Sequence, residues 1–383
     1  MIQTETLIIG ASMAGLASAA CLQKQGIKYI VIEKEKESVA PWRNHYHRLH
    51  LHTNKRISAL PFKKYGPGIP RYPSRAELIH YADAYQKEFN IEPIFNTEAT
   101  SVKRVGDNWV TQTATEIFQS KYLVMATGAF GHPKPLNFKG METFTGTVVH
   151  SYAYKTGSGY KGKKVLVVGF GNSACEIAID LYEQGAMPSL AVRSPVNVIP
   201  RDIMGIPVLE ISLLLSHLPP RIADAVSAPL LRLVLGDITK LGLKKMSYGP
   251  FEQIARDAKI PLLDIGTIGH IRKGHIQVYS GIDYIDGNTV CFSDGQRKVF
   301  DAIIAAIGYS MQSSAMANFE PGRIADARLP LDKQKYFGKD GLYFCGYRIA
   351  ATGQIRTISR DAQKIAAGIA VKVAAGTINS HHN

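Results

Sequence analysis

Residues 6–15, Thr6-Leu-Ile-Ile-Gly10-Ala-Ser12-Met-Ala-Gly15, carry the clearest structural pattern of this chain. It reads as a buried strand that runs into a glycine turn, and residues 13–25 then form an Ala-rich helix. Tyr29-Ile-Val-Ile-Glu33 predicts a second, parallel strand. Gly10 permits the tight turn, and Gly15 lets helix and strand pack closely. The pattern therefore predicts a βαβ unit that binds a dinucleotide.

The same unit indicates which dinucleotide it holds. Free N–H groups and the positive end of the helix dipole suit a pyrophosphate. Glu33 ends the second strand, where a carboxylate accepts hydrogen bonds from ribose hydroxyls and disfavours a 2′-phosphate. Ser12 stands where glycine is usual. We expect FAD, or NAD, rather than NADP here, held by Gly10, Ser12, Met13, Ala14, Gly15, Glu33 and Lys34.

A second unit repeats this logic from Val165-Leu-Val-Val168 onward. Its loop is Gly169-Phe-Gly171-Asn172-Ser173-Ala174, with alanine at the third position, which the fingerprint allows. Arg193 follows its second strand, where a cation can hold a 2′-phosphate by charge-assisted hydrogen bonds. The alternative is that Arg193 is a solvated loop cation. We expect NADPH at this site, held by Gly169, Gly171, Asn172, Ser173, Ala174, Arg193 and Ser194.

Composition excludes several classes of protein. The 383 residues carry a net charge of +14 that is spread along the chain, so an anionic small ligand is expected and nucleic acid is not. The four cysteines lie far apart without a C-x-x-C, which excludes a dithiol redox centre. Histidines 45, 47, 50 and 52 have no carboxylate or cysteine beside them, so no metal is expected. Residues 206–218 are too short and interrupted to span a membrane, and no export signal precedes the first strand, so no transmembrane segment and a cytoplasmic location are expected.

Two dinucleotides on one chain imply hydride transfer from a nicotinamide to a flavin. The fold class expected is α/β, with two nested Rossmann-like dinucleotide-binding domains and a smaller NADPH domain inserted in the FAD domain. The expected FAD domain is discontinuous (1–155 and 296–383), and the NADPH domain (156–295) carries a helical substrate-pocket segment at 203–250. Residues 131–163 are expected to connect the domains. Further elements are expected at 75–89, 122–126, 302–306, 342–345 and 357–375, with helix 208–235 broken at Pro219-Pro220 and Pro229.

One segment carries a family resemblance. Phe144-Thr-Gly146-Thr-Val-Val-His150-Ser-Tyr-Ala-Tyr154 resembles the F-x-G-x-x-x-H-x-x-x-Y/F signature of class B flavin monooxygenases. Ala126-Thr127-Gly128 and Asp301-Ala-Ile-Ile-Ala-Ala-Ile-Gly308 look like the two sheet-end motifs of that family. Val198-Ile-Pro200-Arg201 and Pro261-Leu-Leu-Asp264-Ile-Gly266-Thr267 resemble the plant YUCCA-type branch. Thr53-Asn54-Lys55 instead looks like the flavin-containing monooxygenases, and it departs from the YUCCA-type pattern.

The resemblance implies which residues serve the reaction. NADPH reduces FAD, and oxygen is then activated as a C4a-(hydro)peroxyflavin. The catalytic candidates are Asn54, as the polar contact by flavin and nicotinamide, and His150, which arranges NADP. Their structural alternatives are an asparagine in a turn and a hydrogen-bonded linker histidine. The remaining candidate cofactor contacts are Trp42, Arg43, His52, Thr127, Gly128, Tyr154, Gly308 and Gly346.

The reaction expected is oxygenation of a small organic substrate at N or S by dioxygen. Decarboxylating oxygenation of an indole-3-pyruvate-like 2-oxo acid is a near-equal alternative, because Asn54 favours the former and the YUCCA-like middle favours the latter. A third reading is an NADPH oxidase that produces hydrogen peroxide, and a fourth is a non-enzymatic flavin sensor. The oligomeric state stays open, a homodimer included.

Overall fold

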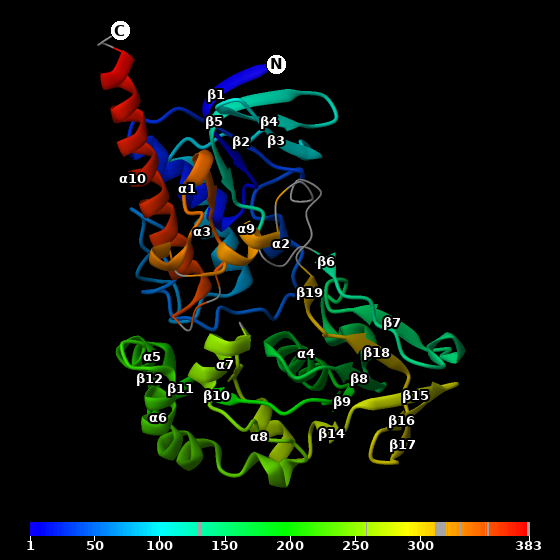
Figure 1. Cartoon of the computed structure of the whole chain (residues 1–383). Coiled ribbons are helices and arrows are strands. Elements are labelled where there is room, and N and C mark those ends of the chain that lie inside the picture. The colour runs from blue at the N-terminus through cyan, green and yellow to red at the C-terminus, as the bar shows by residue number, and fades with distance from the viewer. Residues whose placement is uncertain are drawn as a thin grey trace. The chain divides into compact units, whose positions relative to one another are not determined.

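The computed structural model describes residues 1–128, 132–257, 259–310, 319, 321–329, 331–348, 350 and 352–380. The chain divides into two compact units (Figure 1). The first unit comprises Met1–Arg43, Thr53–His132 and Ser310–Asn383, and the second comprises Asn44–His52 and Pro133–Tyr309. The chain passes from one unit to the other within β6 (His132–Pro133) and again within β19 (Tyr309–Ser310).

The first unit is built on a six-stranded sheet with the order β2-β1-β5-β4-β3, and β20 also pairs with β5. Strands β1 (Ile2–Ile9), β2 (Tyr29–Ile32), β5 (Ile117–Met125) and β20 (Leu342–Phe344) are parallel neighbours. Strands β3 (Ser101–Val105) and β4 (Asn108–Gln112) form an antiparallel edge. The apolar run at the end of β1 is fully buried, as parallel strands covered on both faces require.

Helices cover this sheet in Figure 1. They are α1 (Met13–Lys24), α2 (Ala40–Arg43), α3 (Arg75–Glu88), α9 (Pro321–Asp326) and α10 (Gln354–Ser380), with 3₁₀ turns at Leu331–Lys333 and Lys339–Gly341. A capping box starts α3, because Ser74 accepts from the Glu77 amide while the Glu77 carboxylate accepts from the Ser74 amide. The long helix α10 extends beyond the predicted 357–375 at both ends.

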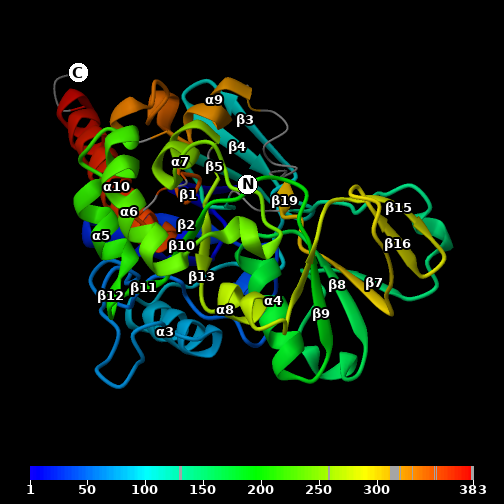
Figure 2. The same ribbon diagram turned by 90° about the horizontal axis from the view of Figure 1, so that it is seen from below.

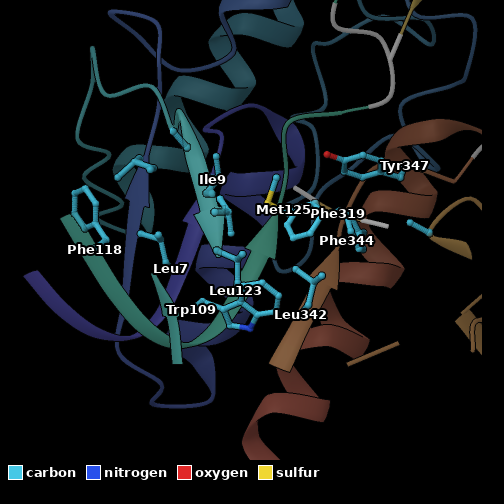
Figure 3. Packing of buried hydrophobic residues seen from close by; sticks show 14 residues of the cluster. Leu7, Ile9, Trp109, Phe118, Leu123, Met125, Phe319, Leu342, Phe344 and Tyr347 are labelled. Carbon is cyan, nitrogen blue, oxygen red and sulfur yellow. The ribbon is translucent and has the colours of Figure 1, made fainter. Parts of the chain in front are cut away.

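Figure 3 shows the core of the first unit on one face of its sheet. Side chains from β1, β5 and β20 meet Phe319 and Tyr347 there. Trp109 joins them, and its indole Nε1 donates to the carbonyl of Asp340 at 2.8 Å. Burying each large apolar side chain contributes about 1.5–3 kcal/mol, so this core fixes the strands that lead into the first glycine loop.

The second unit has a five-stranded parallel sheet with the order β14-β9-β8-β18-β7. Its strands are β7 (Thr147–His150), β8 (Lys164–Val168), β9 (Met187–Ala191), β14 (Gln277–Tyr279) and β18 (Ala302–Ala305). Helix α4 (Asn172–Glu183) connects β8 to β9. An antiparallel sheet of β15 (Ile282–Asp286), β16 (Thr289–Phe292) and β17 (Arg297–Val299) completes the core, with 3₁₀ turns at Met141–Thr143 and Gly157–Tyr160.

A mostly helical insertion lies between β9 and β14. It contains β10 (Val198–Pro200), β11 (Asp202–Ile203), β12 (Ile206–Pro207), α5 (Val208–Leu215), α6 (Pro220–Leu235), a 3₁₀ turn (Ile238–Leu241), α7 (Pro250–Asp257), β13 (Leu262–Asp264) and α8 (Thr267–Arg272). Figures 1 and 2 show α5 and α6 side by side. Pro219-Pro220 separates these helices as predicted. The break predicted at Pro229 is wrong, because Pro229 lies inside a continuous α6 on an exposed face, where water can satisfy the carbonyl it leaves unpaired.

The division of the chain differs from the expected boundaries. Residues 133–155 and 296–309 belong to the second unit because β7 and β18 pair with each other and β18 pairs with β8. The described part of 131–163 is therefore largely structured and not a simple connector; residue 131 lies outside the described residues. Of the helices that the structure describes, none has the length and apolar character needed to cross a membrane.

Candidate cofactor and active site

The first glycine loop is shaped for close packing. Gly10 has φ +105°, and a Cβ there would lie 2.8 Å from the carbonyl oxygen of Ala126 at the end of β5. A Cβ on Gly15 would lie only 1.9 Å from the carbonyl oxygen of Gly10. Both positions therefore need glycine, and the loop turns directly into α1.

The polar groups around this loop fit FAD. Ser12 begins α1 without a side-chain cap, and the first turn holds no acidic residue, so its N–H groups suit an anion. The Glu33 carboxylate accepts from the amide of Ala11 at 2.6 Å and from that of Glu35 at 3.0 Å. Each carboxylate oxygen keeps a second lone pair, which a ribose hydroxyl can use. Lys34 is exposed and lies 3.9 Å from Glu35.

Other residues that were predicted to contact flavin make hydrogen bonds or ion pairs with protein groups of the first unit. Arg43 donates to the Ser38 carbonyl at 3.0 Å and pairs with Glu37 at 3.1 Å and with Asp83. These groups occupy the Arg43 guanidinium. Contacts of Trp42 and Arg43 with flavin stay predictions. Thr127 Oγ1 lies 2.5 Å from the Tyr347 hydroxyl.

Two further candidate glycines lie in the first unit, in different surroundings. A Cβ on Gly346 would lie 3.1 Å from Cβ of Ala14 in α1, so Gly346 allows close packing against that helix. Gly128 has φ +78°, and a Cβ there would meet none of the residues that the structure describes within 4 Å. Glycine at position 128 therefore allows the positive φ and leaves space beside the backbone there.

Asn54 is buried at 2% exposure. Its Oδ1 accepts from the amides of Arg56 at 3.0 Å and Ile57 at 3.3 Å. The side-chain oxygen thus holds the turn that follows, as the structural alternative for this residue predicted. A direct contact with flavin or nicotinamide stays a prediction.

The second glycine loop has one crowded and one open glycine. Gly169 has φ +127°, and a Cβ there would lie 2.5 Å from the carbonyl oxygen of Ala306. Gly171 precedes α4, and a Cβ there would meet nothing within 4 Å. Asn172 Oδ1 accepts from the amide of Leu263 at 2.9 Å, so this side chain also holds β13. With no acid in its first turn, α4 offers Asn172, Ser173 and Ala174 amides to a pyrophosphate.

Arg193 and Ser194 are exposed directly after β9. The Arg193 side chain lies over Gly281, where an added Cβ would be 3.1 Å from Arg193 Cγ. Among the residues that the structure describes, no carboxylate pairs with Arg193. The Arg193 guanidinium, which follows β9, could therefore bind a 2′-phosphate.

His150 ends β7 and is poised as a neutral donor. The amide of Tyr152 donates to its Nδ1 at 3.1 Å, so the ring proton belongs on Nε2. Nε2 is buried and has no well-aligned partner in the part of the chain that the structure describes. Burial lowers the pKa of His150, and the nearby backbone of Gly308 opposes that shift. The Tyr309 ring stands edge-on at 5.4 Å.

Sequence reasoning missed two buried carboxylates on α4. Glu176 is 0% exposed and lies 3.5 Å from Nε2 of His52. Asp180 accepts from the Tyr154 hydroxyl at 2.5 Å, so this hydrogen bond helps to hold Tyr154 against α4. The signal was present, because the two acids are spaced i, i+4 within an otherwise apolar helical run.

The apolar side chains of the expected substrate-pocket segment, 203–250, differ in their exposure. Leu209 and Leu235 are buried, and Leu213, Leu231 and Met246 are half-buried. Leu214 is 76% exposed and faces solvent. Within the described ranges, no three His, Cys, Asp or Glu side chains gather as a metal site would require.

Comparisons with known proteins identify the family of this chain. A family model described as pyridine nucleotide-disulphide oxidoreductase matches residues 7–201. Indole-3-pyruvate monooxygenase YUCCA6 of Arabidopsis thaliana is 36% identical over 385 residues, which cover 96% of this chain and 90% of the relative.

Solved structures share the fold. The flavin-containing monooxygenase from Stenotrophomonas maltophilia has a TM-score of 0.71 at 17% identity, with 97% of this chain and 100% of that chain covered. Cyclohexanone monooxygenase from Rhodococcus sp. Phi1 bound to NADP⁺ has a TM-score of 0.72 at 18% identity, with 97% and 84% covered. These likenesses confirm the predicted α/β fold class.

Two glycine loops, one completed by an acid and the other by a cation, define an oxidoreductase that joins a flavin to a pyridine nucleotide. The chain belongs to the family of flavin-dependent monooxygenases that includes the YUCCA enzymes, and the predicted resemblance is confirmed. It is an NADPH-dependent flavin monooxygenase with FAD and NADPH as cofactors. Its four cysteines are buried and free.

Proposed function

We propose that this enzyme oxygenates a 2-oxo acid of the indole-3-pyruvate type with loss of its carboxyl group. The acid, O₂, NADPH and a proton give the carboxylic acid one carbon shorter, CO₂, water and NADP⁺. The observation that carries the proposal is similarity over 96% of this chain to an indole-3-pyruvate monooxygenase. The net charge of +14 also attracts an anionic substrate better than a cationic amine.

Bound FAD, once reduced by NADPH, supplies the activation of oxygen. In this proposal, the Gly10–Gly15 loop and Glu33 hold FAD, while the loop from Gly169 and Arg193 hold NADPH. His150 offers Nε2–H to the nicotinamide half of the cofactor, because burial keeps the ring neutral and Nδ1 is already engaged. Each of these groups binds or orients a cofactor and leaves the redox chemistry to it.

Oxygenation at N or S is the second candidate, and the presence of Asn54 in place of the YUCCA-type residue favours it. The structure weakens the support that Asn54 gives to oxygenation at N or S, because two backbone amides already use the lone pairs of Asn54 Oδ1. Peroxide production without a substrate is the third candidate, since it needs only the two cofactors.

The test measures NADPH consumed, oxygenated product and hydrogen peroxide with four additions. These are indole-3-pyruvate, a tertiary amine, a thioether and buffer alone. Indole-3-pyruvate is expected to give CO₂ and indole-3-acetate in proportion to NADPH. Oxygenated product from the amine or the thioether, with none from indole-3-pyruvate, supports oxygenation at N or S. Hydrogen peroxide equal to the NADPH consumed with all four additions supports the oxidase.

A further inference from the structure

A buried carboxylate holds one short segment of the chain against α4. Glu176 is fully buried on that helix, and all its polar neighbours come from residues 44–52. Its Oε2 accepts from the Tyr46 hydroxyl at 2.9 Å and lies 3.5 Å from His52 Nε2. Its Oε1 accepts from the His50 amide at 3.3 Å and lies 3.7 Å from an Arg48 nitrogen. One side chain thus gathers four groups from alternate residues of this segment.

The electrostatics of this cluster are strong because water is excluded. Burial and the Glu176 charge raise the pKa of Tyr46 well above its usual range, so the phenol stays a donor. A buried carboxylate surrounded by donors is stable only while each donor keeps its place. The segment is therefore held in one conformation on α4.

Segment 44–52 lies between two groups of candidate residues along the chain. It follows Arg43 and precedes Thr53-Asn54, both in the first unit, while its own contacts belong to the second unit. Helix α4 begins at Asn172 in the second glycine loop, and Glu176 follows two residues after Ala174. The Nε2 atom of His52 lies beside Glu176, and its Nδ1 is buried without a hydrogen-bond partner among the described residues.

We propose that Glu176 is a positioning residue, which clamps segment 44–52 onto α4, orients His52 and thereby keeps NADPH oxidation coupled to oxygenation. The inference rests on the proposed function in placing NADPH at the start of α4 and in taking oxygenation as the reaction. Glu176 touches neither substrate nor cofactor in this account. It acts through the segment that leads into Asn54.

The same helix provides a matched control. Asp180 lies one turn further along α4, is 5% exposed and also binds a tyrosine hydroxyl, that of Tyr154. It also accepts from the Gly157 amide at 2.9 Å. Asp180 therefore matches Glu176 in helix, burial and chemistry, but it holds residues 154–157 and not segment 44–52.

The experiment compares Glu176→Gln, Asp180→Asn and Tyr46→Phe with the wild-type enzyme. Hydrogen exchange is measured first, on the peptide that covers 44–52 in the protein without NADPH. Glu176→Gln is expected to lose protection there, because an amide cannot accept from all four groups, whereas Asp180→Asn is expected to keep it. Tyr46→Phe removes one donor and is expected to lose part of the protection.

Product formed per NADPH is measured second, at saturating NADPH. Glu176→Gln is expected to lower this ratio about fivefold or more, as small misplacements around a reacting centre do, with peroxide making up the difference. Asp180→Asn is expected to keep the wild-type ratio even where its thermal stability falls. Equal loss of coupling in both carboxylate variants overturns the inference, as does unchanged coupling in a Glu176→Gln protein whose segment 44–52 exchanges freely.

Failure of the proposed function gives a different result. Wild-type enzyme would then form no product from indole-3-pyruvate. The hydrogen-exchange comparison still decides whether Glu176 clamps the segment, and coupling is then scored on whichever substrate the wild type oxygenates. Unchanged exchange in Glu176→Gln also overturns the inference.

Discussion

Gly171→Ala is expected to weaken NADPH binding while leaving the folded protein as stable as before. Gly171 has φ −95°, which alanine adopts readily, and the added Cβ would meet no atom within 4 Å. The second glycine of such a loop lies where the pyrophosphate approaches the backbone, so the methyl group takes space that the phosphate needs. Overpacking of this kind costs about 1–3 kcal/mol, and about 2 kcal/mol corresponds to a roughly 30-fold rise in the KM for NADPH.

Gly169→Ala is the matched comparison, because it changes the same loop but strains the fold. Its φ of +127° is unfavourable for any residue with a Cβ, and the new atom would lie 2.5 Å from the Ala306 carbonyl oxygen. Backbone strain of roughly 1–2 kcal/mol and overpacking of roughly 1–3 kcal/mol together give roughly 2–5 kcal/mol. That is a large part of the 5–15 kcal/mol, roughly, that stabilises a typical domain.

The assay records thermal unfolding without nucleotide and steady-state kinetics with varied NADPH. Gly171→Ala should unfold at the wild-type temperature and show the raised KM, and Gly169→Ala should unfold several degrees lower. Two results would contradict this assignment of Gly171: a loss of stability in Gly171→Ala as large as that in Gly169→Ala, or an unchanged KM for NADPH.

Two further predictions concern charge. Arg193→Ala should raise the KM for NADPH about tenfold or more, as expected for a lost charge-assisted hydrogen bond, with little effect on the KM for NADH; equal effects on both cofactors would contradict the assignment. Burial, together with the nearby His275, lowers the pKa of His270 from its usual 6.5, so the unfolded chain takes up this proton more readily than the folded one. The stability that neutral His270 contributes is present above pH 6.5 and is lost as the pH falls below it, so the thermal midpoint of His270→Gln should depend less on pH in that range than that of the wild type.

Local pattern was enough to predict both dinucleotide units. The strand, glycine turn and helix at β1–α1 and at β8–α4 each follow from residues close together in the chain, and the structure has them where they were expected. The acid at Glu33 and the cation at Arg193 also follow strands whose ends could be located from apolar runs. Short-range hydrogen bonding and the alternation of buried residues determine such features.

The limits of the units could not be predicted in the same way. Strand β7 belongs to the second unit because Ile304 of β18 pairs with Val149, far away in sequence. Parallel strands need a long crossover, so no local signal marks which distant strand a segment joins. The same reason moved residues 296–309 out of the expected FAD domain.

Adjacent residues in the sequence were sufficient to predict two glycine loops, each between a strand and a helix, and the family. The packing of segment 44–52 on α4, the role of Glu176 as the acceptor for its donors and the turn held by Asn54 became visible only in the folded chain. The difference is physical. A glycine loop is specified by the sterics of a few adjacent residues, whereas the role of a buried carboxylate depends on donors that folding brings from more than a hundred residues away.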